Sequence, residues 1–238
     1  MACRLLALRL DARDPRRAAA FWGALLDRAP VDDASGVLLR GGDTQVSLRF
    51  VPGRPRTGPH RVHLHVTSSS PADQERTVER ALRLGATPLD VGQRPEEAHV
   101  VLADAEGDEF CVTGPGSTFL AGCGPLGELA CDGTREVGLF WASALDWPLV
   151  WDEDGETAVQ HPRGGTKVAW GGPPVAMRSG PDGRRFELGV TGGDLDAEVD
   201  RLVALGATVR DGDGAGEAVV VLVDPDGGEF SLAAGPAS

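Results

Sequence analysis

The stretch "DPRRAAAFWGALLDRAPV" at positions 14–31 returns later in the chain as "GTREVGLFWASALDWPLV" at 133–150. Two further pairs of segments match at nearly the same spacing, 119 to 121 residues over the three pairs: "LGATPLD" at 84–90 with "LGATVRD" at 205–211, and "VVLADAEGDEF" at 100–110 with "VVLVDPDGGEF" at 220–230. Three matches in one order indicate a duplicated chain. We predict two domains, 1–117 and 118–238, joined through a glycine-rich linker.

Each half contains a smaller repeating pattern. "LLALRLDA" at 5–12 predicts a strand, and Asp14 can cap a helix whose apolar side chains recur at helical spacing. Short strands follow, and the pattern starts again with the strand "RVHLHVT" at 61–67 and a helix that begins after Ser70 and ends at Gly85. The predicted unit is strand, helix and three strands, used four times.

Such units define an α+β fold. The helix covers one face of a mixed sheet, and two adjacent units form a cup whose other face is open to a ligand. We expect Trp22, Trp141 and Trp170 in the core, whereas Trp147 and Trp151 belong either to the core or to a ligand or domain contact.

Composition excludes several classes of function. The 238 residues carry a net charge of −13, which disfavours nucleic-acid binding. The chain has no apolar run of about 18 residues, so no membrane contact is expected, and the early charges at the N-terminus do not suggest a signal peptide. The four cysteines include no CxxC pair and are expected to be free thiols. A cytoplasmic protein is the default expectation.

The strand at 61–67 is the most informative for chemistry. Side chains alternate between the two faces of a strand, so Arg61, His63 and His65 share one face, while the intervening valines and leucine take the other. We expect the apolar face to pack under the helix and the polar face to line the open cup.

Together, "DPRRAAAFWGALL", "RVHLHV", "VERALRLGAT" and "VVLADAEGDEFCV" resemble the vicinal oxygen chelate superfamily, which contains glyoxalases, bleomycin-resistance proteins and dioxygenases. The similarity is greatest to its glyoxalase-like branch and covers nearly the whole chain. It implies paired βαβββ modules that form one cup in each of two tandem domains.

The resemblance also implies where a metal would sit, because metal-dependent members place His, Glu or Gln on four strands of a cup. In the first half the four positions fall on Ala7, on one of Gln45, Ser47 and Arg49, on Arg61 and on Cys111. In the second half they fall on Leu126, on Lys167 or Ala169, on Arg185 and on Ser231. Neither set resembles a cation site, so no metal and no cofactor is predicted. The alternative is a metal site that is displaced from these positions and is formed by His63 and His65 together with Glu109 or Asp11.

The polar face of the first cup is expected to bind a small molecule. Strand alternation assigns to it Arg9, Arg49, Arg61, His63, His65 and Glu109. The arginines favour an anionic or carbonyl-bearing ligand, and His63 or His65 could act as a general acid or base. Cys111 and Glu187 are further candidate ligand contacts. The second cup, with Glu128, Arg185, Glu187, Gly189 and Glu229, is expected to be mainly structural.

The leading hypothesis is therefore a metal-independent protein that sequesters or transforms a small organic molecule, an anion or a natural product, in the first cup. The alternative is a metal-dependent lyase, isomerase or dioxygenase that uses the displaced histidine site. A third hypothesis is a structural module without a ligand. The chain is expected to be a monomer or a homodimer.

Overall fold

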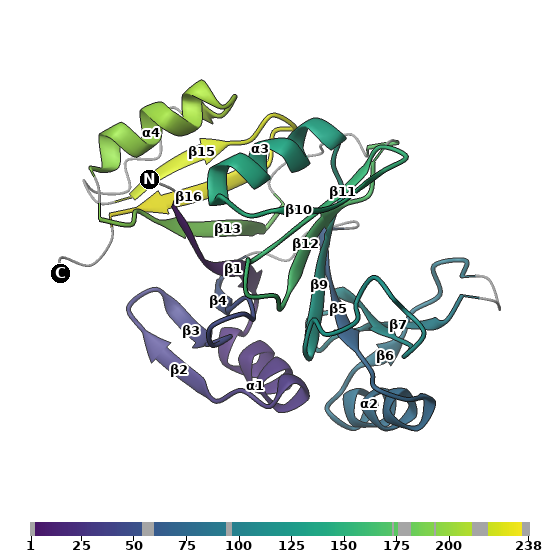
Figure 1. The fold of residues 1–238 in the computed structure, drawn as a ribbon. Helices are drawn as coiled ribbons and strands as arrows, with labels where there is room; N and C mark the ends of the chain where they lie inside the picture. The colour runs from purple at the N-terminus through teal and green to yellow at the C-terminus, as the bar shows by residue number, and fades with distance from the viewer. Residues whose placement is uncertain are drawn as a thin grey trace.

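A computed structural model describes residues 3–53, 60–93, 97–172, 174–175, 182–192, 194–210 and 219–234. The chain runs as β1 (Arg4–Ala12), α1 (Pro15–Leu26), β2 (Pro30–Asp33), β3 (Gly36–Leu39), β4 (Leu48–Pro52), β5 (Val62–Thr67), α2 (Pro71–Arg83), β6 (Thr87–Pro88), β7 (His99–Ala103), β8 (Glu109–Thr113), β9 (Leu126–Cys131), α3 (Arg135–Leu145), β10 (Leu149–Glu153), β11 (Glu156–Gln160), β12 (Lys167–Trp170), β13 (Arg184–Gly189), α4 (Leu195–Ala204), β14 (Thr208–Val209), β15 (Val219–Val223) and β16 (Glu229–Ala233). Strand, helix and three strands recur four times, so the predicted unit and the α+β class are confirmed (Figure 1).

The strands form two mixed sheets of eight strands each within the described residues. Sheet A has the order β14-β15-β16-β13-β1-β4-β3-β2, and sheet B has the order β10-β11-β12-β9-β5-β8-β7-β6. At the centre of each sheet two units meet through antiparallel strands, β1 with β13 and β5 with β9. Sheet A therefore joins the first and fourth units, and sheet B joins the second and third.

This pairing differs from the expected one. The expectation that the two units of one half share a cup is wrong, because each sheet takes one unit from each half. Side-chain alternation predicts which face of a strand is buried but not which strand lies beside it. The halves 1–117 and 118–238 stay a proposal for the duplicated domains, and their end residues Met1 and Ser238 lie outside the described residues.

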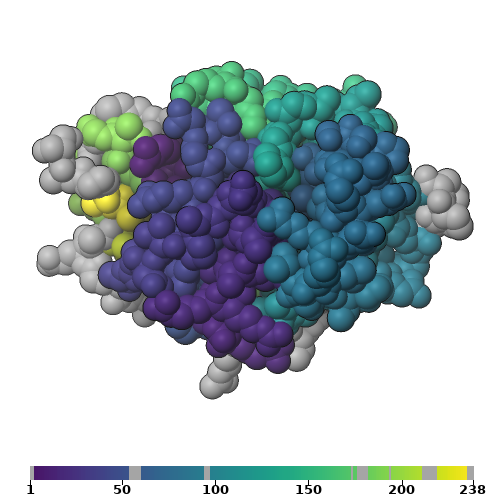
Figure 2. All heavy atoms as spheres, turned by 90° about the horizontal axis from the view of Figure 1, so that it is seen from below, coloured from purple at the N-terminus to yellow at the C-terminus, as the bar shows by residue number. Residues whose placement is uncertain are grey.

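The units of one half still touch each other. Helices α1 and α2 pack together, and Figure 2 shows the first unit, in purple, beside the second, in blue. The core lies between the two sheets. Trp22 of α1 packs on Phe110 of sheet B, and Trp141 of α3 packs on Phe186 and Phe230 of sheet A.

Local signals explain where the helices begin. The Asp14 side chain accepts a hydrogen bond from the backbone N–H of Arg17, and the Ser70 side chain accepts one from Asp73, as predicted for N-caps. Gly85 follows α2 with a φ of 104°, a conformation that glycine adopts without strain. No helix among the described residues is long and apolar enough to span a bilayer.

The repeated Phe-Trp pair and the repeated acidic turn meet in space. Trp22 Nε1 donates a 2.9 Å hydrogen bond to Asp104 Oδ2, and Trp141 Nε1 donates one of 3.2 Å to Asp224 Oδ2. Both indoles are 1% exposed, and Trp170 is also buried, which confirms the core assignment of these three tryptophans. Burial raises the pKa of Asp104, and the charge of Asp108 raises it further. The indole donor therefore compensates for a buried acid.

A Trp22→Phe variant will lower the free energy of unfolding by about 2–4 kcal/mol, because it opens a cavity and leaves the Asp104 carboxyl short of a donor. Urea denaturation followed by circular dichroism measures this loss. Trp151→Phe is the matched control, since Trp151 is 38% exposed and its loss should cost under about 0.5 kcal/mol. Equal losses in the two variants would contradict the assigned role of the Trp22 hydrogen bond.

Candidate functional site

A row of polar residues crosses the four central strands of sheet B. His65 of β5 lies opposite Cys111 of β8 and Glu128 of β9, and Lys167 of β12 lies opposite Glu128. Residues that are direct partners across neighbouring strands point to the same face of a sheet. All four side chains therefore lie on one face, the face opposite the core, and His63 joins them two residues along β5.

The side chains in this row converge. The ligand atoms of His63, His65 and Cys111 all lie within 4.8 Å of one another. The two imidazole ring centroids are 5.0 Å apart. His65 Nδ1 lies 2.7 Å from Glu128 Oε2, whereas its Nε2 is buried and has no hydrogen-bond partner among the described residues. Within the described chain, this is where His, Cys, Asp and Glu groups gather with metal-ligand spacing.

The two histidines have opposite electrostatic environments. Burial lowers the pKa of His63 to about 3, and the neighbouring charge on His65 adds to the effect. Burial also lowers the pKa of His65, but Cys111 and Glu128 outweigh burial and raise the pKa to about 10. Without a ligand, the neutral imidazole is therefore His63, and the charge resides on His65 against the Glu128 carboxylate.

The donor set fits a divalent transition-metal ion. A metal-bound histidine commonly gives one ring nitrogen to the ion while a carboxylate holds the other, which is the arrangement that Glu128 provides for His65. Two imidazoles and one thiol are donors that suit zinc and its neighbours. Three protein ligands would leave a coordination position for a substrate, as in catalytic zinc sites.

Lys167 occupies the end of the row where a fourth ligand would be expected from the resemblance. Its Nζ donates to the carbonyl of Phe119 and lies 4.1 Å from the centre of the Phe119 ring. An ammonium group cannot coordinate a cation, so Lys167 supplies positive charge beside the row instead. Phe119 in turn packs edge-to-face on Trp151, which places one of the two uncertain tryptophans near this site.

The predicted site residues separate into two groups. His63, His65, Glu109 and Cys111 lie in sheet B, whereas Arg9, Arg49 and Glu187 lie in sheet A. The prediction that a single cup holds all the arginines and histidines is therefore wrong. Asp11, one of the partners proposed for a displaced histidine site, belongs to sheet A as well.

Glu128 is the residue that sequence reasoning misplaced. The sequence predicts that Glu128 lies in a second, structural cup, but the antiparallel register of β5 and β9 brings its carboxylate onto His65. Arg61 lies outside the row, because its guanidinium pairs with Asp132 at 3.3 Å and donates to the carbonyls of Asp132 and Asp226. It ties the start of β5 to the end of β9 and to the turn before β16.

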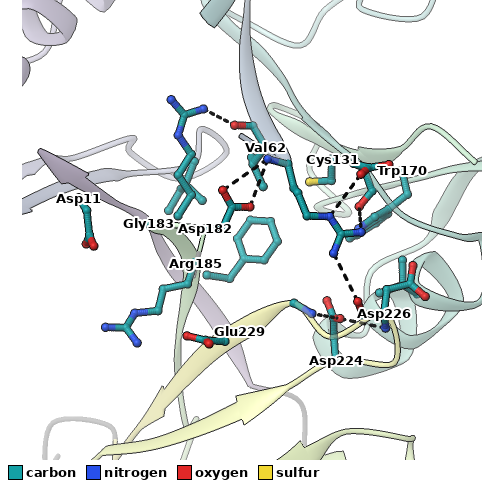
Figure 3. A pocket seen from close by; sticks show the side chains of 17 residues that line it. Asp11, Val62, Cys131, Trp170, Asp182, Gly183, Arg185, Asp224, Asp226 and Glu229 are labelled. Atoms are coloured by element: carbon teal, nitrogen blue, oxygen red, sulfur yellow. Dashed lines mark hydrogen bonds and ion pairs between the residues drawn. The ribbon is translucent and has the colours of Figure 1, made fainter. Parts of the chain in front are cut away.

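The two sheets meet at a cavity of about 160 Å³ (Figure 3). Its apolar wall includes Val62, Trp170 and Phe186, and its polar wall includes Asp182 and Arg185. It lies apart from the row on sheet B, because none of the four row residues lines it.

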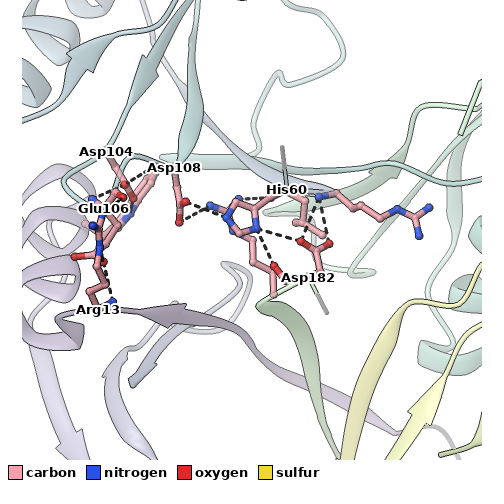
Figure 4. Close-up of polar contacts among 10 residues, drawn as sticks. Arg13, His60, Asp104, Glu106, Asp108 and Asp182 are labelled. Carbon is pink, nitrogen blue, oxygen red and sulfur yellow. Dashed lines mark hydrogen bonds and ion pairs between the residues drawn. The ribbon is translucent and has the colours of Figure 1, made fainter. Parts of the chain in front are cut away.

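A buried network of charges also spans this junction (Figure 4). His60 Nε2 lies 2.9 Å from Asp108 Oδ1, and His60 Nδ1 lies 3.1 Å from Asp182 Oδ1. Arg184 lies 2.9 Å from the other oxygen of Asp108 and also donates to the carbonyl of Val62. The sequence does not predict this network, because its members lie at three separate places in the chain, near residues 60, 108 and 182–184.

The charges of the network shift the pKa values of its members. Burial lowers the pKa of His60, but hydrogen bonds to Asp108 and Asp182 outweigh burial and raise it. Burial raises the pKa of Asp108, yet His60 and Arg184 lower it to about 2. The network therefore links sheet A and sheet B through an ion pair between the Asp108 carboxylate and the Arg184 guanidinium.

The arrangement of the four units, with a polar row across paired central strands, defines a two-domain vicinal oxygen chelate fold. The Glyoxalase-like domain family matches the chain twice, at residues 7–113 and 128–233. The chain belongs to this family, as the resemblance predicted. No curated protein matches the sequence.

Solved structures agree with this assignment of the fold. The chain is similar to glyoxalase I from Zea mays, with a TM-score of 0.66 and 14% identity over 98% of this chain and 92% of that one. It is also similar to a putative dioxygenase from Bacillus subtilis, with a TM-score of 0.59 and 12% identity over 100% of this chain and 87% of that one. At these identities the likeness shows the fold alone.

Proposed function

We propose that this chain binds one divalent transition-metal ion through His63, His65 and Cys111 and acts there on a small organic molecule. The observation that carries the proposal is the surroundings of the two ring nitrogens of His65. Its Nδ1 is held by Glu128 while its buried Nε2, with no partner among the described residues, lies within reach of the other two donors. A metal ion bound there would displace the Nε2 proton of the charged ring, because a histidine ligand is deprotonated at the coordinating nitrogen. A buried nitrogen without a partner is costly unless a ligand satisfies it.

Each residue of the row has a definite role in this proposal. Glu128 fixes the orientation of the His65 ring and keeps its Nε2 directed at the shared position. A bound divalent ion supplies Lewis-acid polarisation of a substrate oxygen. Lys167 contributes a positive charge beside the row and favours a substrate that carries or develops negative charge. Phe119 and Trp151 offer an aromatic wall next to that ammonium group.

The metal-independent hypothesis remains the alternative. In that case the same face of sheet B binds an organic ligand, and the charge on His65 and Lys167 selects an anion. The metal proposal is favoured because two imidazoles and a thiol converge, whereas an anion site would need more guanidinium or amide donors than this row provides.

Calorimetric titration of chelator-treated protein with zinc tests the proposal. We expect a stoichiometry of one and a metal-dependent rise in melting temperature, worth about 2.7 kcal/mol when free zinc is a hundredfold above its dissociation constant. A His161→Ala variant is the control, because His161 lies outside the cluster and packs edge-to-face on Trp147. The absence of binding by zinc, cobalt, nickel and ferrous iron would leave the metal-independent alternative.

A further inference from the structure

The face of sheet A opposite the core carries three arginines in one row. Arg185 of β13 is the direct partner of Arg9 on β1, and Arg9 is the direct partner of Arg49 on β4. The intervening residues of β1 and β13, including Leu8 and Phe186, enter the core, so the arginines point to the opposite face. Like charges on directly opposed residues destabilise a sheet unless anions compensate for them.

The described carboxylates pair with only some of these three arginines. Arg49 is satisfied by both Glu187, at 2.7 Å, and Asp33. Glu229, a carboxylate whose charge acts on Arg185, forms an ion pair with Arg210. The half-buried Arg185 side chain makes no hydrogen bond and no ion pair with any described residue, although the charges of Asp11, Glu229 and Glu187 act on it.

Arg9 also has unused hydrogen-bonding capacity. Its contact with Asp11 is long, at 3.4 Å, and its Nε is buried without a partner among the described residues. Two neighbouring guanidinium groups therefore present N–H donors that have no partner among the described residues on one face of the sheet. A guanidinium group is well suited to hold the two oxygens of a carboxylate or phosphate in parallel.

Arg185 also borders the cavity at the junction of the sheets. Arg185, Asp11 and Glu229 lie together at one side of it (Figure 3). The cavity passes the first residues of β13 and continues on the core side of that strand to Trp170 and Phe186. Its volume of about 160 Å³ is enough for a small organic group but not for a large cofactor.

We propose that Arg185 and Arg9 bind the oxyanion of a small organic acid, a carboxylate or a phosphate ester, whose apolar part enters the junction cavity. This site lies on the other sheet from the proposed metal site and does not depend on it. The chain carries a net charge of −13, and carboxylates outnumber arginines in the cavity wall, so an anion would be held by direct hydrogen bonds from Arg185 and Arg9 and not by the overall charge of the site.

Calorimetry with three probes tests this site: inorganic phosphate, phenyl phosphate and phenylacetate. The protein is first treated with a chelator, because a bound cation would itself attract phosphate. We expect phenyl phosphate or phenylacetate to bind more tightly than inorganic phosphate, since only the former two fill the apolar part of the cavity. The tighter of the two identifies the headgroup.

Variants locate the binding. Arg185→Met should weaken binding of the best probe by roughly tenfold or more, and Arg185→Lys should restore part of it, because lysine keeps the charge but not the paired donors. Arg163→Met is the matched control, since Arg163 is exposed and pairs only with Asp43 in the described chain. It should bind like the wild type.

Three results would overturn the proposal. The first is no measurable binding of any probe at millimolar concentration. The second is unchanged affinity in a folded Arg185→Met variant. The third is an equal loss in Arg163→Met. If Arg185→Met does not fold, Arg9→Lys replaces it, and unchanged affinity in that variant would overturn the role of Arg9.

Discussion

A His65→Ala variant will bind zinc more than about a hundredfold more weakly than the wild type, because it removes one of three converging ligands. Loss of a partner that only orients a ligand costs about 10- to 100-fold in metal affinity, and loss of the ligand itself should exceed that range. Glu128→Gln should therefore fall within the range, since the amide cannot supply the carboxylate that holds His65 Nδ1. Competition calorimetry with a chelator of known affinity measures both variants.

The order of the two losses is the informative result. Replacing the ligand should cost more than replacing the residue that orients it, while His161→Ala should leave the affinity unchanged. If Glu128→Gln lost more affinity than His65→Ala, then Glu128 would be the direct ligand. If neither variant differed from the wild type, zinc would be bound elsewhere and the proposed site would be wrong.

An Asp108→Asn variant will lose about 3 kcal/mol of unfolding free energy near neutral pH. The change leaves His60 and the almost fully buried Arg184 without their shared carboxylate, and removing one partner of a buried ion pair costs about 3–5 kcal/mol. Lowering the pKa of Asp108 from 3.8 to about 2 by itself corresponds to about 2 kcal/mol. Urea denaturation measures the loss, with the exposed Asp43→Asn as the control.

The loss should depend on pH in a defined direction. The ionised Asp108 stabilises the fold fully above pH 3.8, and this contribution disappears as the pH falls through about 2. The pKa of His60 is raised, so its charge stabilises the fold below its unfolded value and ceases to do so as the pH rises through the folded value. The gap between wild type and Asp108→Asn should therefore be widest at mildly acidic pH. A gap that stayed constant from pH 2 to pH 8 would contradict the ionic account.

Local features of the fold were predictable from the sequence. Asp14 and Ser70 cap their helices by their own side chains, so the residues that decide the helix boundaries lie within a few positions of them. The repeated Phe-Trp pair and acidic turn also predicted a duplicated unit, and the structure shows the reason: Trp22 and Asp104 bond to each other in one half, as do Trp141 and Asp224 in the other.

The pairing of the units was not predictable in the same way. Strands β1 and β5 have similar alternation, and each pairs through an antiparallel edge with a unit of the other half. Nothing in the alternation of β1 distinguishes β13 from β5 as its neighbour. The error placed Arg9 and Arg49 beside the histidines and Glu128 away from them, although each residue was assigned to the correct face of its own strand.

The candidate site was predicted in part for the same reason. The alternation of β5 identified His63 and His65 as a pair on the polar face, and Cys111 lies opposite His65 on the parallel neighbour β8. Glu128, whose carboxylate holds His65, is 63 residues away from it in the sequence and reaches it only through the register of β5 and β9. Long-range register of this kind is set by the packing of whole units, not by a local motif.

Absorption spectroscopy of the cobalt-substituted protein tests the metal site most directly. Chelator-treated wild-type protein with one equivalent of Co²⁺ should show visible bands of a low-symmetry site and a near-ultraviolet thiolate-to-cobalt charge-transfer band. Cys111→Ser should lose the charge-transfer band, because the other three cysteines, Cys3, Cys123 and Cys131, lie outside the cluster. A spectrum identical to cobalt in buffer, or a charge-transfer band that persists in Cys111→Ser, would contradict a metal ion held by His63, His65 and Cys111.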